Sequence, residues 1–245
     1  MHDDRVEFEE ASIASARDIG ADEMLQTQAQ QLFAAADKHD YSYVWKWLGM
    51  PIIQVPADIV ATQEIIWETR PTLIVETGVA RGGSLIFYSS ILQLLGEGEV
   101  LGIDIDVRQH NREAIESHPL GHRVRLIQGS SVEPHVVEQV ARRAASAARV
   151  LVVLDSNHTH DHVLAEMRAY ADLVTAGSYL IVADTIVDKI PGHLHRNRPW
   201  GPANNPATAV RAFLRERDDF VADLEVNGKL LLTSSPGGYL KRLRG

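Results

Sequence analysis

Apolar and polar positions alternate in blocks along residues 72–185. Five short blocks are almost continuously apolar and rich in Val, Ile and Leu, which predicts strands that are buried on both faces. These blocks are residues 72–78, 99–106, 123–130, 149–156 and 177–185. The segments between them repeat apolar residues every three or four positions, which predicts amphipathic helices. The alternation predicts an α/β fold with a Rossmann-like, doubly wound and mostly parallel sheet.

The N-terminal part of the chain lacks this alternation, and we expect a helical extension over 1–60 beside a main domain over 61–245. The pattern predicts a helix over 21–40. Its apolar face comprises Leu25, Leu32 and Phe33. A second amphipathic helix is predicted over 57–70. Its expected buried side chains are Ile59, Ile66 and Trp67.

The C-terminal part of the chain predicts one more helix and two more strands. The helix, over 204–217, has Asn205 in position to cap its first turn and a proline directly after it. The strands are expected within 224–243, on either side of the dipeptide Asn227-Gly228, which is typical of a tight β-hairpin.

Composition narrows the possible functions. The chain has 245 residues, of which 45% are hydrophobic, enough for one sizeable core. Its formal net charge of -9 argues against general nucleic-acid binding, because clustered Lys and Arg neutralise phosphates. The absence of cysteine excludes disulfides, Cys-ligated zinc and cysteine nucleophiles, and suits a cytoplasmic protein. The acidic N-terminus does not resemble a signal peptide, and no apolar run reaches the roughly 18 residues of a membrane span.

The turn after the first predicted strand is rich in glycine. Its spacing is Glu76-x-Gly78-x-x-x-Gly82-Gly83-Ser84. Glycines at such a turn let the backbone approach a ligand, and the following helix N-terminus offers free N–H groups. The spacing differs from the G-x-G-x-x-G dinucleotide fingerprint, which argues against a NAD-dependent oxidoreductase. A tight strand–helix turn that binds nothing would also use glycine.

Polar residues also end the second and third predicted strands. Asp104 stands where doubly wound folds bind a ribose hydroxyl, although Asp106 is expected on the same side of the strand. Gly129, Ser130 and Ser131 follow the third strand and could line an adenine pocket. Because ligands of such sheets bind at the carboxyl ends of the strands, these motifs together predict a nucleoside-bearing cofactor.

The fourth and fifth predicted strands each end in an acid. Asp155 and Asp184 are far apart in sequence, but we expect them at the same edge of a parallel sheet. Paired carboxylates suit Mg²⁺, and Thr185 or Asp188 could complete the set of ligands. Either carboxylate could instead cap the helix that follows it.

Histidines alternate in the stretch "LDSNHTHDHV", residues 154–163. His158 lies three residues after Asp155 in a predicted loop, which places a general base beside the metal. His160 and His162 are expected in solvent or at the start of the next helix, with His162 pointing away. Alternating histidines across a loop-to-helix transition are not expected to converge on zinc.

The order of these motifs resembles the class I S-adenosylmethionine-dependent methyltransferases, and among them the divalent-metal-dependent O-methyltransferases. In those enzymes E-x-G-x-x-x-G-x-S opens the cofactor site, and a metal-binding Asp stands three residues before a catalytic Lys or His. Most of residues 41–243 resembles the rhamnosyl O-methyltransferase/cephalosporin hydroxylase family. The segments that carry this resemblance are "YVWKWLGMPIIQVPADIVATQEIIWE", "IVETGVARGGSLIFYSS", "VLGIDIDVRQHNREAIESHP", "LDSNHTHDHVL", "GSYLIVADTIVD", "RPWGPANNPATAV" and "GYLKR".

The resemblance implies S-adenosylmethionine and Mg²⁺ as cofactors and methylation of a rhamnose-like deoxysugar hydroxyl in antibiotic biosynthesis. It assigns catalysis to His158 and Asp155, cofactor binding to Glu76, Gly78, Gly82, Ser84, Asp104, Gly129, Ser130, Ser131 and Asp155, and metal binding to Asp155, Asp184 and Thr185. Ala183 stands where some family members have an acid, so Thr185, Asp188 or water could be the third ligand. No two-His-one-carboxylate iron site is evident, which favours methyl transfer over hydroxylation.

The expected acceptor is a glycosylated natural product or a nucleotide sugar, with a cephem-type or other non-sugar hydroxyl as the alternative. Residues 41–47 and 200–205 supply aromatic side chains for a substrate wall, or equally for a core or subunit contact. We expect a homo-oligomer without nucleic-acid or membrane partners. An alternative hypothesis is a non-catalytic cofactor-binding module, but the presence of Asp155, His158 and Asp184 argues against it.

Overall fold

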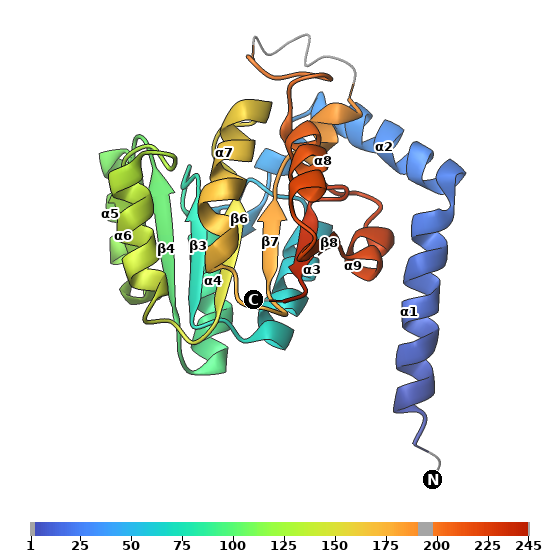
Figure 1. The fold of residues 1–245 in the computed structure, drawn as a ribbon, viewed down its shortest axis with the longest axis horizontal. Helices are drawn as coiled ribbons and strands as arrows, with labels where there is room; N and C mark the ends of the chain where they lie inside the picture. Colours follow the sequence, from blue (N-terminus) through green and yellow to red (C-terminus); the bar gives the residue numbers. More distant parts are fainter. Residues whose placement is uncertain (1–2, 191–197, 245) are drawn as a thin grey trace.

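The computed structural model describes residues 3–190 and 198–244 and contains a seven-stranded central sheet (Figure 1). Its strands are β3 (Leu73–Thr77), β4 (Glu99–Asp104), β5 (Val124–Gln128), β6 (Val150–Leu154), β7 (Tyr179–Val182), β8 (Phe220–Ala222) and β9 (Tyr239–Arg242). The order across the sheet is β5-β4-β3-β6-β7-β9-β8. The strands from β3 to β7 are parallel, and β9 runs antiparallel to both β7 and β8. The predicted doubly wound, mostly parallel sheet is confirmed.

Helices cover both faces of this sheet. On one face lie α3 (Pro56–Thr69), α4 (Gly83–Leu95) and α5 (Gln109–Ser117). On the other face lie α6 (Pro134–Ala144), α7 (His160–Tyr170) and α8 (Pro206–Glu216). Neighbouring strand residues pack on opposite sides, with Ile74 and Val153 on the first face and Val75 and Val152 on the second. Double burial is the reason why the central strands are apolar at nearly every position.

The chain winds outward in two directions from the middle of the sheet. It passes from β3 to β4 and β5 on one side and from β6 to β7 on the other, so the order reverses between the neighbours β3 and β6. Such a reversal leaves a crevice at the carboxyl ends of the strands, where ligands of open α/β sheets bind. Gly78, Asp104, Asp155 and Asp184 all lie at this edge.

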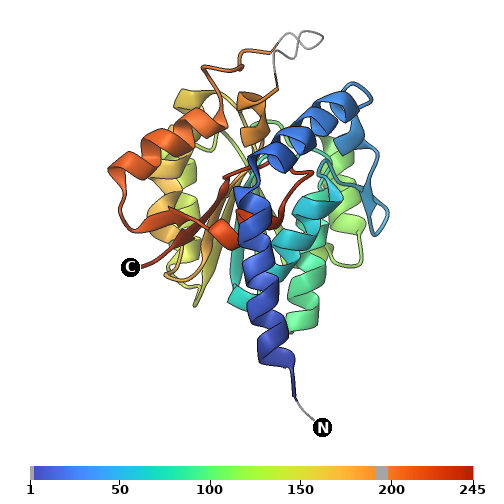
Figure 2. The same ribbon diagram turned by 90° about the vertical axis from the view of Figure 1, so that its right-hand side faces the viewer.

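The first two helices lie outside the sheet. α1 (Arg5–Ala21) runs down one side of the molecule against α9 (Leu224–Lys229), and α2 (Glu23–Asp37) lies near the carboxyl ends of the strands (Figures 1 and 2). Phe33 of α2 packs against Val55, Ile186 and Ile190. Within the described ranges, no helix combines the length and apolar composition that crossing a bilayer requires.

One predicted buried position, Trp67, is wrong, and one residue of the predicted apolar face, Leu32, is exposed. Leu32 is 56% exposed and Trp67 is 46% exposed. Their neighbours Phe33 and Ile66 are buried, as predicted. Consecutive helical residues point about 100° apart, so the residue beside the most buried position faces solvent when only one side of the helix is covered.

The hairpin predicted at Asn227-Gly228 is also wrong, because both residues lie in α9, which the Asp223 carboxylate caps. The Asn227 side chain donates to the main-chain oxygens of Asp223 and Tyr239. Gly228 allows a close contact with α1, since a Cβ there would lie 2.4 Å from the Ala16 carbonyl oxygen. Only one of the two strands expected within 224–243 is present there, as β9, because β8 ends at Ala222, before this range, and a helix in place of a turn connects β8 to β9.

Asn205 is confirmed as the cap of α8. Its side chain accepts a hydrogen bond from the Thr208 main-chain nitrogen at 3.0 Å and is fully buried. Its Nδ2 group donates to the main-chain oxygens of Gly201 and Pro202 and to the Asp188 carboxylate. One amide therefore fixes both the helix start and the loop before it.

Asn205→Ala should lower the free energy of unfolding by about 2–4 kcal/mol. The lost cap costs about 1 kcal/mol, and buried groups left without partners cost about 1–3 kcal/mol more. Urea unfolding measures the change. Gln139→Ala, on the exposed side of α6, is the control and should change the value by less than about 0.5 kcal/mol. Equal midpoints for the two variants would contradict the capping role.

Candidate active site

The turn between β3 and α4 forms the centre of the site. Gly78 has a φ of 92° and lies directly against the end of β6. A Cβ at this position would lie 2.0 Å from the Asp155 carbonyl oxygen, so only glycine fits there. Ala80 in the same turn has a left-handed φ of 45°, a conformation that costs roughly 1–2 kcal/mol for a residue with a side chain.

Glu76 lies beneath this turn. Its carboxyl group is completely buried and accepts hydrogen bonds from the Ser84 hydroxyl at 2.6 Å and the Tyr88 hydroxyl at 2.8 Å. Burial raises the pKa of Glu76 to about 8, despite these two hydrogen bonds. A carboxyl group that is largely neutral near pH 7 therefore joins β3 to α4, and it supports the turn from inside the protein.

A cavity of about 290 Å³ lies in front of the turn, between the ends of β3, β4, β5 and β6. We call it the cofactor cavity. Of the predicted cofactor-binding residues, it is lined by Gly78, Asp104, Gly129, Ser130, Ser131 and Asp155. Gly82 and Ser84 line a small adjoining cavity, and Glu76 lines neither of the two.

Asp104 faces the turn and the cofactor cavity together. Its Oδ2 atom accepts hydrogen bonds from the main-chain nitrogens of Val79 at 2.8 Å and Ala80 at 3.3 Å. Its Oδ1 atom accepts one from the main-chain nitrogen of Asp106 at 3.0 Å. The structure thus distinguishes the two acids, because β4 ends at Asp104, and Asp106 lines no part of this cavity.

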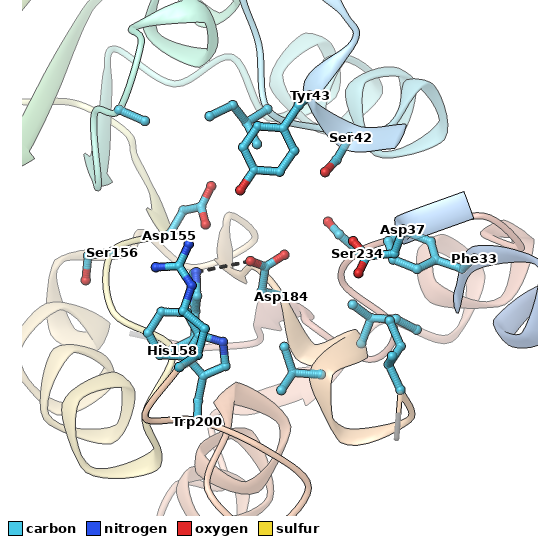
Figure 3. A pocket seen from close by; sticks show the side chains of 16 residues that line it. Phe33, Asp37, Ser42, Tyr43, Asp155, Ser156, His158, Asp184, Trp200 and Ser234 are labelled. Carbon is cyan, nitrogen blue, oxygen red and sulfur yellow. Dashed lines mark ion pairs between the residues drawn. The ribbon is translucent and has the colours of Figure 1, made fainter. Parts of the chain in front are cut away.

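A second cavity of about 330 Å³ adjoins the first, and we call it the acceptor cavity. The two share Ala80, Asp155 and Ser156 as lining residues. Figure 3 shows Asp155 and Asp184 converging in it, with Tyr43 opposite them. Segments distant in sequence complete its wall, including Phe33 of α2, Tyr43 of the 3₁₀-helix η1 (Tyr41–Tyr43) and Trp200 before α8.

Asp155, His158 and Asp184 form one cluster. Each offers a ligand atom within 4.8 Å of the others, and His158 Nε2 lies 3.1 Å from Asp184 Oδ2. Trp200 packs edge-on against the His158 ring, with centroids 4.7 Å apart. Burial raises the pKa of Asp155 well above its ordinary value, and the charge of Asp184 raises it further. Two repelling carboxylates beside an imidazole are a donor set that fits a divalent cation.

The chain turns sharply at Asp184, which has a left-handed φ of 55° and precedes the 3₁₀-helix η4 (Thr185–Asp188). This turn carries Thr185 away from the cluster. The Thr185 hydroxyl is buried and donates to the Pro236 carbonyl oxygen at 2.9 Å. Asp188 instead forms an ion pair with Arg211 at 3.0 Å. The structure therefore brings neither candidate third ligand to Asp155 and Asp184.

The alternating histidines have different partners. His160 Nδ1 lies 2.8 Å from the Thr208 hydroxyl of α8. His162 lines the cofactor cavity, so the prediction that it points away is wrong. α7 begins at His160, which turns His162 toward the loops that follow β5 and β6. Its Nε2 atom lies 3.2 Å from the hydroxyl oxygens of both Ser131 and Ser156.

The family model for Rhamnosyl O-methyltransferase/CmcI matches residues 39–243. The rhamnosyl O-methyltransferase of Mycobacterium tuberculosis (strain ATCC 25618 / H37Rv) is 30% identical over 245 residues, covering 91% of this chain and 94% of that protein. The Mycobacterium leprae (strain TN) protein of the same name is 30% identical over 207 residues, covering 82% and 86%. A CmcI structure with Mg and SAM has the same fold, with a TM-score of 0.59 and 22% identity, covering 83% of this chain and 78% of that chain.

Glu76 should make stability depend on pH. Between about pH 4.5 and 8 it is ionised in the unfolded chain and largely neutral in the folded protein. Its stabilising contribution is therefore complete below about pH 4.5 and is lost as the pH rises through about 8.

The stability of the wild type relative to Glu76→Gln should consequently fall between pH 5 and pH 8, by roughly 1 kcal/mol per pH unit. Urea unfolding of both proteins at several pH values measures the difference, and other titrating groups cancel in the subtraction. A difference that stays flat or rises with pH would show that Glu76 is already ionised in the folded protein.

Proposed function

The chain belongs to the rhamnosyl O-methyltransferase/CmcI family of S-adenosylmethionine-dependent O-methyltransferases, and from this premise we propose that it methylates a deoxysugar hydroxyl at a divalent cation held by Asp155 and Asp184. The expected enzyme class is thereby confirmed. The observation that carries the proposal is the shared wall of the cofactor and acceptor cavities, which meet at Asp155. A methyl donor in the first would face an acceptor in the second.

The cofactor cavity suits S-adenosylmethionine, which supplies an electrophilic methyl group when bound. Asp104 lies where a ribose hydroxyl would be held, and the main-chain hydrogen bonds it accepts from Val79 and Ala80 fix its orientation. Gly78 lets the backbone approach the ligand closely, for the same reason that it can lie against Asp155. The CmcI structure of similar fold was solved with SAM and Mg.

The cluster of Asp155, His158 and Asp184 suits Mg²⁺. Held there, Mg²⁺ would lower the pKa of an acceptor hydroxyl, which is otherwise a poor nucleophile at neutral pH. Asp155 is half-buried at the end of β6 and Asp184 is held at the sharp turn after β7, so both carboxylates are positioned before any ligand arrives. Because the two carboxylates are already in place, they would bind a cation more tightly than carboxylates on a flexible surface would.

We assign proton removal to His158. Trp200 and Asp184 fix its ring, so that Nε2 is directed into the acceptor cavity within reach of a hydroxyl bound beside Asp155. The same nitrogen lies close enough to serve as a third cation ligand, in place of the acid that some relatives have at Ala183. The two roles lead to different measurable results.

The acceptor cavity has a wall suited to a sugar. Phe33, Tyr43 and Trp200 present aromatic side chains to it, and such faces stack well on sugar rings. Because Phe33 and Tyr43 belong to residues 1–60, we propose that this extension closes over the substrate. Four further points stay predictions. They are the identity of the acceptor as a glycosylated natural product or a nucleotide sugar, a role in antibiotic biosynthesis, a homo-oligomeric assembly and a cytoplasmic location.

A mass-spectrometric screen tests the function directly. The protein, S-adenosylmethionine and deoxysugar-bearing acceptors should yield a singly methylated product, EDTA should reduce the yield, and Mg²⁺ should restore it. Asp155→Asn and Asp184→Asn should each lose most of the response to Mg²⁺. Asp161→Asn, exposed on α7, is the matched control. Unchanged Mg²⁺ titration curves in the two site variants would place the cation elsewhere.

His158→Ala should lower kcat by about 10²–10⁴-fold, the usual cost of losing a general base. If His158 acts as the base, the Mg²⁺ concentration for half-maximal rate should stay within a few-fold of the wild-type value. If it is a ligand, that concentration should rise and excess Mg²⁺ should recover activity. His160→Ala, which loses only the contact with α8, should stay within a few-fold of wild type. Wild-type turnover in His158→Ala would exclude both roles.

A further inference from the structure

A buried polar cluster adjoins the cofactor cavity, and its centre is Glu166 of α7. Glu166 is completely buried, and its Oε1 atom accepts hydrogen bonds from the Ser131 hydroxyl at 2.5 Å and the Ser156 hydroxyl at 2.7 Å. Ser131 follows β5 and Ser156 follows β6. One carboxylate therefore holds together two loops that line the cavity. The Tyr170 hydroxyl also donates a hydrogen bond to the Ser131 carbonyl oxygen.

His162 lies one helical turn before Glu166. Its Nε2 atom lies 3.2 Å from both serine hydroxyl oxygens and 3.5 Å from Glu166 Oε1. Each hydroxyl has a single proton, and both protons are donated to Glu166. Neither serine can then donate to the imidazole, so Nε2 must be the ring nitrogen that carries the proton.

This arrangement fixes the chemistry of the other ring nitrogen. In a neutral imidazole one nitrogen donates and the other accepts, so Nδ1 of His162 is an acceptor. Among the residues that the structure describes, none donates a hydrogen bond to it. The side chain is 24% exposed and lines the cofactor cavity. Nδ1 is therefore an acceptor that a ligand can satisfy.

The cavity that this acceptor lines also offers an apolar surface for a purine. Ile105, which also lines it, is 74% exposed, and a flat ring would cover this apolar side chain. Asp104, Ile105, Ser131 and His162 all line this one cavity, so a nucleoside that places its ribose at Asp104 and its base over Ile105 would share the cavity with His162.

We propose that His162 determines cofactor specificity by accepting, at Nδ1, a hydrogen bond from the exocyclic amino group of adenine. Ser131, Ser156 and Glu166 act as positioning residues that set its tautomer. The inference rests on the proposed function, because it assumes a nucleoside cofactor. A 6-oxo purine would present a second acceptor to Nδ1, and the buried pair would be left without a hydrogen bond.

Calorimetric titration at pH 8, where histidine side chains are mostly neutral, tests the proposal without turnover. The ligands are S-adenosylhomocysteine and its 6-oxo analogue S-inosylhomocysteine. The wild type should prefer the adenine compound by about tenfold or more. His162→Ala should weaken its binding by about 5–30-fold, the loss of one hydrogen bond, and should remove most of the preference.

Two conservative variants separate the ring nitrogens. His162→Asn keeps a polar atom near the position of Nδ1 and should retain much of the preference, whereas His162→Gln reaches only the position of Nε2 and should behave like the alanine variant. Glu166→Met removes the oxygen that accepts both serine protons at similar side-chain size, so the serines become free to donate to Nε2, and the variant should reduce the preference. His122→Ala, on the exposed 3₁₀-helix η2 (Gly121–Arg123), is the control and should bind like wild type.

The outcomes separate this inference from the function on which it rests. Equal affinity and equal preference in wild type and His162→Ala would overturn the role of His162 and leave methyl transfer intact. Absence of S-adenosylhomocysteine binding by the wild type would overturn both. Loss of affinity with an unchanged preference would show that His162 shapes the cavity without reading the base, which also contradicts the proposal.

Discussion

Gly78 lies so close to the carbonyl oxygen of Asp155 that no side chain could be placed between them. This contact joins the β3–α4 turn to the end of β6 at the reversal of strand order. Main-chain hydrogen bonds from Asp155 to Thr77 and from Gly78 to Ile103 hold the same junction. Because the turn borders the cofactor cavity and Asp155 borders the acceptor cavity, the two cavities meet at this point. A bulkier residue at position 78 would push the β3–α4 turn away from the end of β6 and so separate the two cavities.

Buried acids concentrate around this junction at a cost in stability. Burial raises the pKa of Glu76, Asp155 and Asp58, which means that their charged forms are disfavoured in the fold. Asp58 shows how the surrounding structure offsets this cost. It accepts hydrogen bonds from the Ser234 main-chain nitrogen at 2.8 Å and the Tyr239 hydroxyl at 3.0 Å. These bonds hold the segment from which Ser234 lines the acceptor cavity.

The three histidines of residues 154–163 contact three different parts of the structure. His158 joins the carboxylates of Asp155 and Asp184, His160 contacts α8, and His162 faces the cofactor cavity. His158 lies in the loop between β6 and α7, whereas His160 and His162 lie in the first turn of α7 and point about 200° apart around the helix axis. A single short segment thereby connects the two cavities and the helix layer behind them.

The sequence alone determined the features that depend on local pattern. Apolar runs and helical periodicity located the parallel strands and their helices, Asn205 was recognisable as a cap, and the order of polar strand ends located Asp104, Asp155 and Asp184 at one edge. Tertiary contacts decided the rest, because they depend on partners distant in sequence. The Thr185 hydroxyl donates a hydrogen bond to the Pro236 carbonyl oxygen, and α1 packs against α9 where a hairpin was expected. The serine–glutamate cluster, built from two loops and a helix, decided that His162 faces the cofactor cavity, and no periodicity within residues 154–163 contains that information.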